Sequence, residues 1–433
     1  MKKTIILSAA VLVLAACGCG KPQTLPIIPT GEVANAPSEL VSLAASARDN
    51  WQIYQVNPKL YGSSGAFGKI QARLDDIQAL GTEFLYLMPV YAEGKKNAIG
   101  SPYCIRDFKA VNSSYGTLEE LKSLVDAAHA KGMKVMFDWV ANHTSWDNPW
   151  ITDHADWYEH KADGSIAWPT KDGEWKDVAQ LDYANKDLWA AMEDALSYWV
   201  TTVGIDGYRC DYAHGVRDDF WKDAIAKLKA QKPGFVMLAE SDFERMFDDG
   251  FDIIFDRAMK SNMRKLFGGG KAADFVSWYK GDLEKTPAPK TKLFFVTNHD
   301  DATEAAPAAQ FKSKEGALAA YVIMAALNGS AMIYGSQEVG YDKTINFFNT
   351  MTMDWSADAV LTKAYREALQ ALAKVDRSKA VTISALDGLV VVRYGSGSVV
   401  AVNTGSASVT ANLSKMGGGE KEVFEGYTFK IWN

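Results

Sequence analysis

The feature that most constrains this chain is the repetition of short apolar runs separated by amphipathic stretches. Near-continuous apolar runs are typical of buried parallel strands, and amphipathic stretches such as TLEELKSLVDAAHAKG are typical of helices. Eight runs over roughly 320 residues predict a (β/α)8 TIM barrel, longer than the usual ~250 residues because of insertions. The runs are WQIYQV at Trp51, FLYLMPV at Phe84, KVMFDWV at Lys134, GIDGYRC at Gly204, FVMLAE at Phe235, FDIIFD at Phe251, KLFFVT at Lys292 and AMIY at Ala331.

Two segments depart from this repeat, which is expected over residues 48–373. The chain from His143 to about Lys186 far exceeds the 2–6 residues of a usual βα loop, so residues 144–186 are predicted to form a lobe over the barrel mouth. In residues 374–433 short alternating runs with Gly-Ser and Gly-Gly turns predict an antiparallel β domain. The lobe is rich in tryptophan, which we interpret mostly as its own core and not as a sugar-binding wall: Trp146, Trp150, Trp157, Trp168 and Trp175.

The first residues indicate an extracytoplasmic, membrane-anchored protein. Residues 1–17, MKKTIILSAAVLVLAAC, carry two lysines, a short apolar run and small residues, as a secretory signal requires. The ending LAAC resembles a bacterial lipobox, which would make Cys17 the lipid-carrying N-terminus; the alternative is an ordinary signal peptide that contains a cysteine. The proline-bearing residues 18–47 are predicted to be a flexible tether with a reach on the order of 30 Å. No later stretch has 18 consecutive apolar residues, so we expect the chain to be anchored to a membrane without spanning it.

Charge and cysteine content exclude other classes. Lys plus Arg is 46 against 53 for Asp plus Glu, a net charge of -7, which gives no general attraction to phosphate backbones and makes nucleic acid an unfavourable partner. The two cysteines of the body, Cys104 and Cys210, are too few for a disulfide framework, and we expect free, mostly buried thiols.

Charged residues gather where the predicted strands end, the position from which TIM barrels supply their reactive side chains. Period-two alternation places Arg209 and Asp211 on one side of their strand, while Glu240 and Asp300 end apolar runs whose burial would penalise a lone charge. A single such acid is usually structural. Three together, beside an arginine and two histidines, indicate a reaction centre.

Four segments resemble the four sequence regions of the α-amylase family, glycoside hydrolase family 13, in the same order and spacing. They read DWVANH, GYRCD, a Glu after MLA, and TNHD. Two longer segments also resemble the family, SPYCIRDFKAVNSSYGTLEELKSLVDAAHAKGMKVMFDWVANHTS and IYGSQEVG. The similarity therefore covers residue 50 to about 433. The resemblance implies a retaining hydrolase of α-1,4-glucosidic bonds in starch, glycogen or maltodextrins.

A retaining mechanism needs one ionised carboxylate as nucleophile and one protonated carboxyl group as acid. Asp211 lies beside Arg209, whose charge would favour the ionised nucleophile. Glu240, with no cation adjacent in sequence, is the candidate for a raised pKa and the acid/base role. The resemblance implies that Asp300 binds sugar hydroxyls at the transition state.

Further substrate-binding roles follow from the resemblance. His143 and His299 would bind hydroxyls of the same sugar, Tyr103 would be the aromatic platform under its ring, and Arg209 completes this substrate-binding group. Asp138 is interpreted as structural, organising the barrel mouth.

The chain also departs from the family. His214 and Gly215 stand where many members have a Lys-His pair that helps bind sugar and calcium. Asn142 matches a calcium-binding asparagine, but Gln180 stands where the family commonly has an acid, and a neutral amide is a poorer ligand for this hard cation. No cofactor is therefore implied as required, and calcium stays open.

Two alternatives remain at this point. The same scaffold serves α-glucosidases, oligo-1,6-glucosidases and transglycosylases, because loops decide the bond and the acceptor. A non-catalytic glycan-binding lipoprotein or transporter subunit would instead be expected to have a damaged triad, whereas Asp211, Glu240 and Asp300 are all present.

Overall fold

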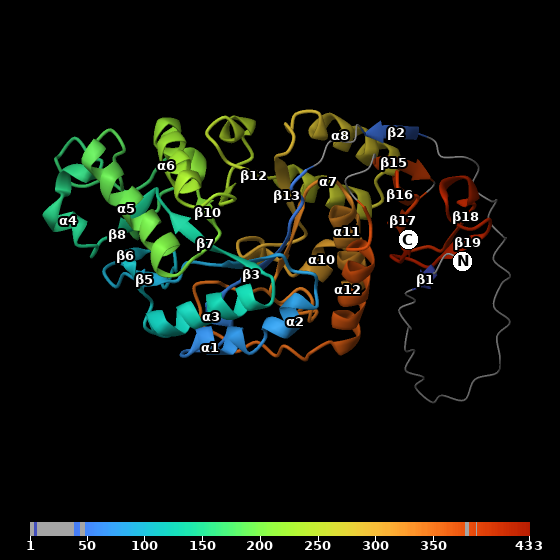
Figure 1. Cartoon of the computed structure of the whole chain (residues 1–433), viewed down its shortest axis with the longest axis horizontal. Helices are drawn as coiled ribbons and strands as arrows, with labels where there is room; N and C mark the ends of the chain where they lie inside the picture. Colours follow the sequence, from blue (N-terminus) through green and yellow to red (C-terminus); the bar gives the residue numbers. More distant parts are fainter. Residues whose placement is uncertain (1–3, 7–38, 44–47, 377–380, 387) are drawn as a thin grey trace.

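The computed structural model describes residues 4–6, 39–43, 48–376, 381–386 and 388–433. Eight parallel strands close into a barrel, in the spatial order β10-β11-β12-β13-β14-β3-β4-β7 (Figure 1). Each lies in one of the eight apolar runs, so the predicted barrel is confirmed. The strands are β3 (Gln52–Val56), β4 (Phe84–Leu87), β7 (Lys134–Val140), β10 (Gly207–Asp211), β11 (Val236–Ala239), β12 (Ile253–Phe255), β13 (Thr291–Phe295) and β14 (Ser330–Tyr334).

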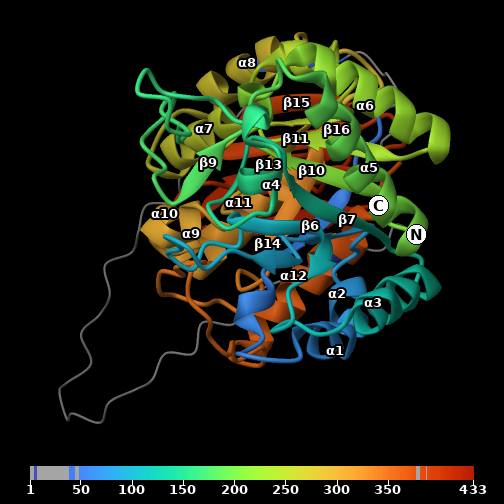
Figure 2. The ribbon, with the colours of Figure 1, turned by 90° about the vertical axis from the view of Figure 1, so that its left-hand side faces the viewer.

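Helices surround the barrel, as the view from its lobe end shows (Figure 2). The helical repeat is interrupted once: between β11 and β12, where every residue is described, there is only the 3-10 turn η4 (Glu244–Phe247). The other connections carry α1 (Ala66–Gln71), α2 (Leu74–Gln78), α3 (Leu118–Ala130), α5 (Lys186–Thr202), α6 (Asp218–Gln231), α7 (Arg257–Phe267), α8 (Ala272–Leu283), α9 (Asp301–Glu304), α10 (Pro307–Gln310), α11 (Lys314–Ala326) and α12 (Ala359–Leu372), with 3-10 turns η1 (Pro58–Leu60) and η3 (Ala213–Gly215).

Alternate residues of the strands fill the barrel interior, because side chains of a strand point to opposite faces in turn. The interior cluster is apolar and almost fully buried: Ile53, Phe84, Tyr86, Met136, Val236, Leu238, Ile253, Phe255, Leu293, Phe295 and Met332. This packed plug closes the barrel below its mouth, so a ligand has access only to the ends of the strands and the loops that follow them.

The lobe is built from two connections, not one. The long segment after β7 contains β8 (His143–Ser145), α4 (Trp150–Asp153), η2 (Ala155–Trp157) and β9 (Val178–Gln180). The connection after β4 adds a hairpin that the sequence analysis did not identify, β5 (Tyr91–Glu93) and β6 (Ile105–Val111), and β6 contacts β8.

The tryptophans of the lobe serve mostly as its core, as predicted. Trp157 is buried and stacks on His154 with ring centroids 3.8 Å apart, and Trp150 packs on Trp157 and Phe108. Trp175 is the exception, because it lines the cavity described below.

The C-terminal residues form the predicted antiparallel β domain. Its sheet has the order β1-β20-β17-β16-β15-β2, and it includes β15 (Val381–Leu386), β16 (Leu389–Tyr394), β17 (Val399–Asn403) and β20 (Phe429–Trp432). Val390 and Val392 face the barrel's core cluster, while Leu389 and Val391 join a separate cluster on the other face. The remaining elements are β18 (Val409–Ala411), η5 (Ser414–Met416) and β19 (Glu422–Phe424).

Two strands of this sheet come from the N-terminal region. β2 (Glu39–Leu43) pairs antiparallel with β15, which corrects the prediction of a tether through residue 47. The sequence ELVSL suits an edge strand, and this local signal was outweighed by the prolines before it. β1 (Thr4–Ile6) pairs with β20 and falls within the predicted signal peptide; residues 7–38, including Cys17, lie outside the described residues.

Two further observations concern the described residues. Cys104 and Cys210 are free and buried, as predicted. Among these residues no helix has both the length and the apolar character that crossing a membrane requires.

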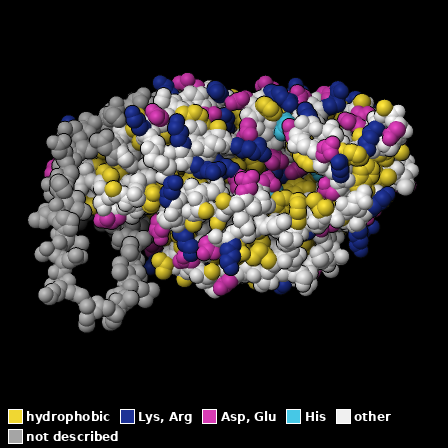
Figure 3. Space-filling view, turned by 180° about the vertical axis from the view of Figure 1, so that it is seen from behind, with side chains coloured by type: hydrophobic (Ala, Val, Ile, Leu, Met, Phe, Trp, Pro, Cys, Tyr) yellow, Lys and Arg dark blue, Asp and Glu magenta, His cyan; other side chains and the backbone are white. Residues whose placement is uncertain are grey.

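The face seen from behind is hollowed near its centre, and acidic and histidine side chains lie around the hollow (Figure 3).

Candidate active site

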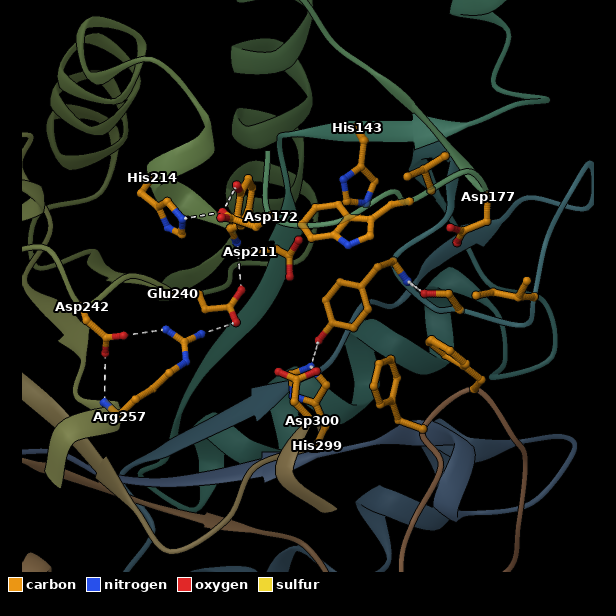
Figure 4. Close-up of a pocket in the computed structure, with 18 of the residues that line it drawn as sticks. His143, Asp172, Asp177, Asp211, His214, Glu240, Asp242, Arg257, His299 and Asp300 are labelled. Carbon is orange, nitrogen blue, oxygen red and sulfur yellow. Dashed lines mark hydrogen bonds and ion pairs between the residues drawn. The ribbon is translucent and has the colours of Figure 1, made fainter. Parts of the chain in front are cut away.

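A cavity of 680 Å³ opens at the carboxyl ends of the barrel strands, between the barrel and the lobe (Figure 4). Six of the seven predicted site residues of the barrel line it; Arg209 does not. The lining consists of Ile99, Ser101, Tyr103, His143, Asp172, Trp175, Asp177, Val178, Asp211, Tyr212, His214, Glu240, Asp242, Phe243, Arg257, His299, Asp300, Phe347 and Phe348.

Arg209 lies beneath the cavity, fully buried, and joins three carboxylates. Its Nη1 lies 2.7 Å from Asp138 Oδ1 and 2.9 Å from Asp211 Oδ1, and its Nη2 lies 3.0 Å from Glu240 Oε2. A planar guanidinium fixes both the distance and the orientation of the groups it binds. The prediction that Arg209 binds substrate is therefore corrected: with no exposed surface, it holds Asp211 and Glu240 beside each other.

Glu240 has no cation adjacent in sequence, but in the structure it lies close to a second arginine besides Arg209. Arg257, the first residue of α7, donates from Nη2 to Glu240 Oε1 at 2.8 Å. The backbone N–H of Tyr212 donates to Glu240 Oε2 at 2.9 Å. Sequence adjacency misled the prediction because strand β12, which brings Arg257 to the mouth, neighbours β11 in the barrel.

Burial dominates the electrostatics of Asp211. It raises the pKa of this carboxyl well above its usual range; the Arg209 guanidinium acts against the rise, and the charges of Glu240 and Asp138 add to it. This outcome differs from the prediction that Arg209, by favouring the charged form, makes Asp211 the ionised carboxylate. Desolvation outweighs one ion pair when a carboxylate is withdrawn from water.

A chain of hydrogen bonds connects the cavity wall to the buried centre. The Gln55 amide donates to His299 Nδ1 at 2.9 Å, so His299 Nε2 carries the proton and donates to Tyr103 Oη at 2.7 Å. Tyr103 in turn donates to Asp138 Oδ2 at 2.8 Å. The Tyr103 and His299 rings are stacked, with centroids 5.3 Å apart. Asp138 is fully buried, consistent with its predicted organising role.

The two histidines are neutral at ordinary pH. Burial lowers the pKa of His143 to about 4 and that of His299 to about 3, where the Arg209 charge adds to the effect. A neutral imidazole both donates and accepts hydrogen bonds, which suits a sugar hydroxyl. His143 lies edge-on to Trp175, with ring centroids 5.8 Å apart.

Asp300 faces the cavity from the loop after β13, next to His299, and its side chain is half-exposed (Figure 4). Partial desolvation raises the pKa of its carboxyl, against the charges of Arg209 and Arg257. The three predicted carboxylates thus converge on one cavity, with Asp211 and Glu240 joined by Arg209 and Asp300 separate from that pair.

Known proteins resemble this chain in both sequence and fold. Residues 41–237 match the family described as "Alpha amylase, catalytic domain". A solved structure of an α-amylase from Lactobacillus plantarum superposes with a TM-score of 0.76 at 28% identity, covering 88% of this chain and 98% of that one. This part of the chain is therefore similar to an α-amylase catalytic domain.

The curated relatives are longer than the matched region. Alpha-amylase MalA of Haloarcula japonica is 28% identical over 305 residues, which is 66% of this chain and 44% of that protein. An alpha-1,4-glucan:maltose-1-phosphate maltosyltransferase of Rhodospirillum rubrum is 32% identical over 285 residues, 57% of this chain and 39% of that enzyme. The chain thus spans less than half the length of these two relatives.

The residues at the position of the calcium site of α-amylase domains do not fit the cation. Gln180 Nε2 donates to Asn142 O at 3.0 Å, to Asn142 Oδ1 at 3.2 Å and to Leu181 O at 3.0 Å. The two backbone carbonyls accept only, which fixes the nitrogen on their side. The oxygens that would face calcium here thus accept hydrogen bonds from an amide nitrogen, which is not a calcium ligand. Within the described residues no cluster of three or more His, Cys, Asp or Glu side chains could hold a metal.

Several residues that shape the cavity were not predicted. Arg257 and Asp242 follow β12 and β11, and the polar ends of those strands were the available signal. Phe347 and Phe348 come from the loop after β14 and line the cavity. The sequence does not show whether an aromatic residue in such a loop lines a cavity or packs inside the loop. Tyr103 was predicted, but the hairpin that presents it was not.

Proposed function

We propose that this protein is a retaining glycoside hydrolase that cleaves α-1,4-glucosidic bonds in starch, glycogen or maltodextrins. The observation that carries the proposal is the buried Arg209, which bridges Asp211 and Glu240 at the floor of a 680 Å³ cavity. One guanidinium can bind two carboxyl groups only when they lie close together. Such proximity is what a retaining enzyme requires, because its two carboxyl groups lie about 5–5.5 Å apart.

In the first half of the reaction Asp211 attacks the anomeric carbon. The bond from that carbon to the glycosidic oxygen breaks, and Glu240 gives its proton to the departing oxygen. In the second half, Glu240 takes a proton from water, the water oxygen bonds to the anomeric carbon, and Asp211 leaves. Two displacements restore the original α configuration.

Tyr103, His143, His299 and Asp300 are placed to hold the sugar that reacts. A neutral histidine can donate a hydrogen bond to a sugar hydroxyl or accept one from it, and neither needs a charged ligand. The Tyr103 ring offers an apolar face to the sugar. Phe243 is 53% exposed beside Glu240 and is suited to contact the sugar on the leaving side.

The charge of the cavity favours a neutral acceptor. One arginine, Arg257, faces a lining with an excess of acidic side chains, and both His143 and His299 are uncharged at neutral pH. Like charges repel in a cavity with limited water, so phosphate is disfavoured as an acceptor relative to water or another sugar. The acids are Asp172, Asp177, Asp211, Glu240, Asp242 and Asp300.

Product analysis tests the proposal. Purified protein is incubated with soluble starch, pullulan and maltose, and products are separated by chromatography, with Asp211→Asn as the matched control. Malto-oligosaccharides from starch support the proposal. Rapid glucose release from maltose would indicate an α-glucosidase, products longer than the substrate would indicate transglycosylation, and no product from any α-glucan would overturn the proposal.

We also propose that the mature chain is a bacterial lipoprotein, attached outside the cytoplasm through a lipid on Cys17. The LAAC sequence supports this, and the residues between Cys17 and β2 would give a reach on the order of 25 Å if they behave as a coil. Cleavage before Cys17 would remove β1 and leave β20 as the sheet edge. Cys17→Ala should release activity from the membrane fraction into the soluble one; unchanged membrane association would contradict the anchor.

A further inference from the structure

Both oxygens of Glu240 already face hydrogen-bond donors. Oε2 accepts from the Tyr212 backbone N–H at 2.9 Å and lies 3.0 Å from Arg209 Nη2, while Oε1 accepts from Arg257 Nη2 at 2.8 Å. Because each carboxyl oxygen has two lone pairs, a proton on Oε2 would compete with two neighbouring donor groups, whereas a proton on Oε1 would share that oxygen with Arg257 alone. This arrangement therefore fits the carboxylate form of Glu240, whereas the proposed first step needs the acid form.

The donors at Oε2 are fixed in place. One is a backbone group at the end of β10, and the other belongs to Arg209, which has no exposed surface and is also held by Asp138 and Asp211. Neither can turn away without disturbing the barrel core. The proton of the acid form must therefore be carried by Oε1.

The donor at Oε1 is the movable one. The Arg257 side chain is 43% exposed and has a second partner, Asp242, which accepts from Arg257 Nη1 at 2.9 Å and from the Arg257 backbone N–H at 2.9 Å. Asp242 is itself 44% exposed, and the Arg257 guanidinium lies between Asp242 and Glu240 (Figure 4). If Arg257 turns away from Glu240, its charge keeps a partner.

We propose that Arg257 is a positioning residue that alternates with the proton of Glu240: it contacts Oε1 when Glu240 is a carboxylate and stays on Asp242 alone when Glu240 is the acid. The inference rests on the proposed hydrolytic function. In the first step Glu240 Oε1 gives its proton to the glycosidic oxygen, and Arg257 then contacts the new carboxylate. In the second step a proton from water returns to Oε1, and Arg257 turns back to Asp242.

Several charged and titratable groups surround Glu240. The charged and titratable groups that face it are Arg209 and Asp211 from β10, Tyr212 and His214 after β10, Asp242 after β11, Arg257 from α7, Asp138 from β7, Tyr86 from β4, and His299 and Asp300 after β13. Burial and the charge of Glu240 both raise the pKa of Asp211.

The experiment compares pH profiles of kcat/KM for Arg257→Met and Asp242→Asn with wild type. Maltotetraose serves as the substrate that needs an acid, and α-maltosyl fluoride as the one whose leaving group departs with little help from a proton. The alkaline limb is the part of the profile in which kcat/KM falls as pH rises. With maltotetraose, Arg257→Met should move this limb to higher pH by about one unit, because the cation that favours the carboxylate is lost. Asp242→Asn should move it down, because Arg257 then has Glu240 as its only charged partner.

Two controls separate this effect from general damage. Arg217→Met removes an exposed arginine that pairs with Asp219 away from the cavity and should leave the limb in place. Arg257→Lys keeps the charge but not the two-pronged donor, so its limb should lie between those of wild type and Arg257→Met. With α-maltosyl fluoride, whose leaving group needs little help from a proton, the alkaline limb should not show these opposite shifts in Arg257→Met and Asp242→Asn.

An unmoved limb in both Arg257→Met and Asp242→Asn, or shifts in the same direction, would overturn the inference even if turnover fell, because a merely structural role lowers rates at every pH alike. These outcomes are read on an active wild-type enzyme. If wild type itself hydrolyses neither substrate, the proposed function fails instead, so the two failures are distinguishable.

Discussion

Two arginines contact the same glutamate but differ in their surroundings. Arg209 is fully buried and binds three carboxylates, whereas Arg257 is 43% exposed and binds Glu240 and Asp242 at the rim. A buried guanidinium with several partners fixes a geometry, because leaving it unpaired would be costly. A half-exposed one with an alternative partner can change position at low cost. The site thus combines a rigid floor, which holds the carboxylates together, with an adjustable rim.

The largest expected effect tests the rigid floor. Asp211→Asn keeps an oxygen for Arg209 but removes the attacking carboxylate, so turnover on every α-glucan should fall by several powers of ten while substrate still binds. Kinetics with maltotetraose and binding by calorimetry measure both. Near-normal turnover in Asp211→Asn would show that this residue is not the nucleophile. Asp242→Asn, which removes a carboxylate from the rim, should lose far less.

Substitution of Arg209 tests how much this residue contributes to the stability of the fold. Arg209→Met leaves Asp138, Asp211 and Glu240 without their shared cation, and the free energy of unfolding should fall by about 3–5 kcal/mol. Urea denaturation at neutral pH measures this. The exposed Arg217→Met is the matched control and should change stability by less than about 1 kcal/mol. Equal effects of the two substitutions would remove the distinction between buried and exposed arginines.

Burial of His143 makes the stability of the protein depend on pH. The pKa of His143 is lowered to about 4 from its usual 6.5, so below pH 6.5 the unfolded chain binds a proton that the folded chain refuses. The stabilisation is complete above pH 6.5 and is lost as pH falls towards 4, at roughly 1.4 kcal/mol per pH unit. The slope of unfolding free energy between pH 6 and 5 should therefore be shallower in His143→Gln than in wild type.

The smallest expected effect concerns the junction of lobe and barrel. Because the Gln180 amide already satisfies Asn142 and Leu181, a chelator should leave activity and melting temperature unchanged within error. Gln180→Glu replaces that donor by a carboxylate, and its melting temperature should be lower than that of wild type and rise on adding calcium. Inactivation of the wild type by chelator, reversed by calcium, would contradict this reading of the junction.

The sequence predicted the parts of the site that lie within single segments. Arg209 and Asp211 alternate on one strand, and the apolar runs before Glu240 and Asp300 place each at a strand end. A barrel of parallel strands then brings such ends together, so the convergence of the three carboxylates could be expected. The buried strands were equally clear, because burial on both faces leaves a continuous apolar run.

What the sequence did not predict depends on contacts between segments. Arg257 meets Glu240 because β11 and β12 are neighbours, and no local pattern reveals which cation a carboxylate will contact. The charge state of Asp211 depends on how completely the barrel mouth excludes water, which is a property of the packed structure. β2 was missed because its partner, β15, lies more than 300 residues away.

The most direct test of the account is the configuration of the first product. Proton NMR of maltotetraose hydrolysis, recorded before mutarotation, distinguishes an α from a β anomer at the new reducing end. Asp211 as nucleophile and Glu240 as acid and base, held together by Arg209, predict an α-configured first product. A β-configured first product would mean a single displacement by water and would contradict the mechanism.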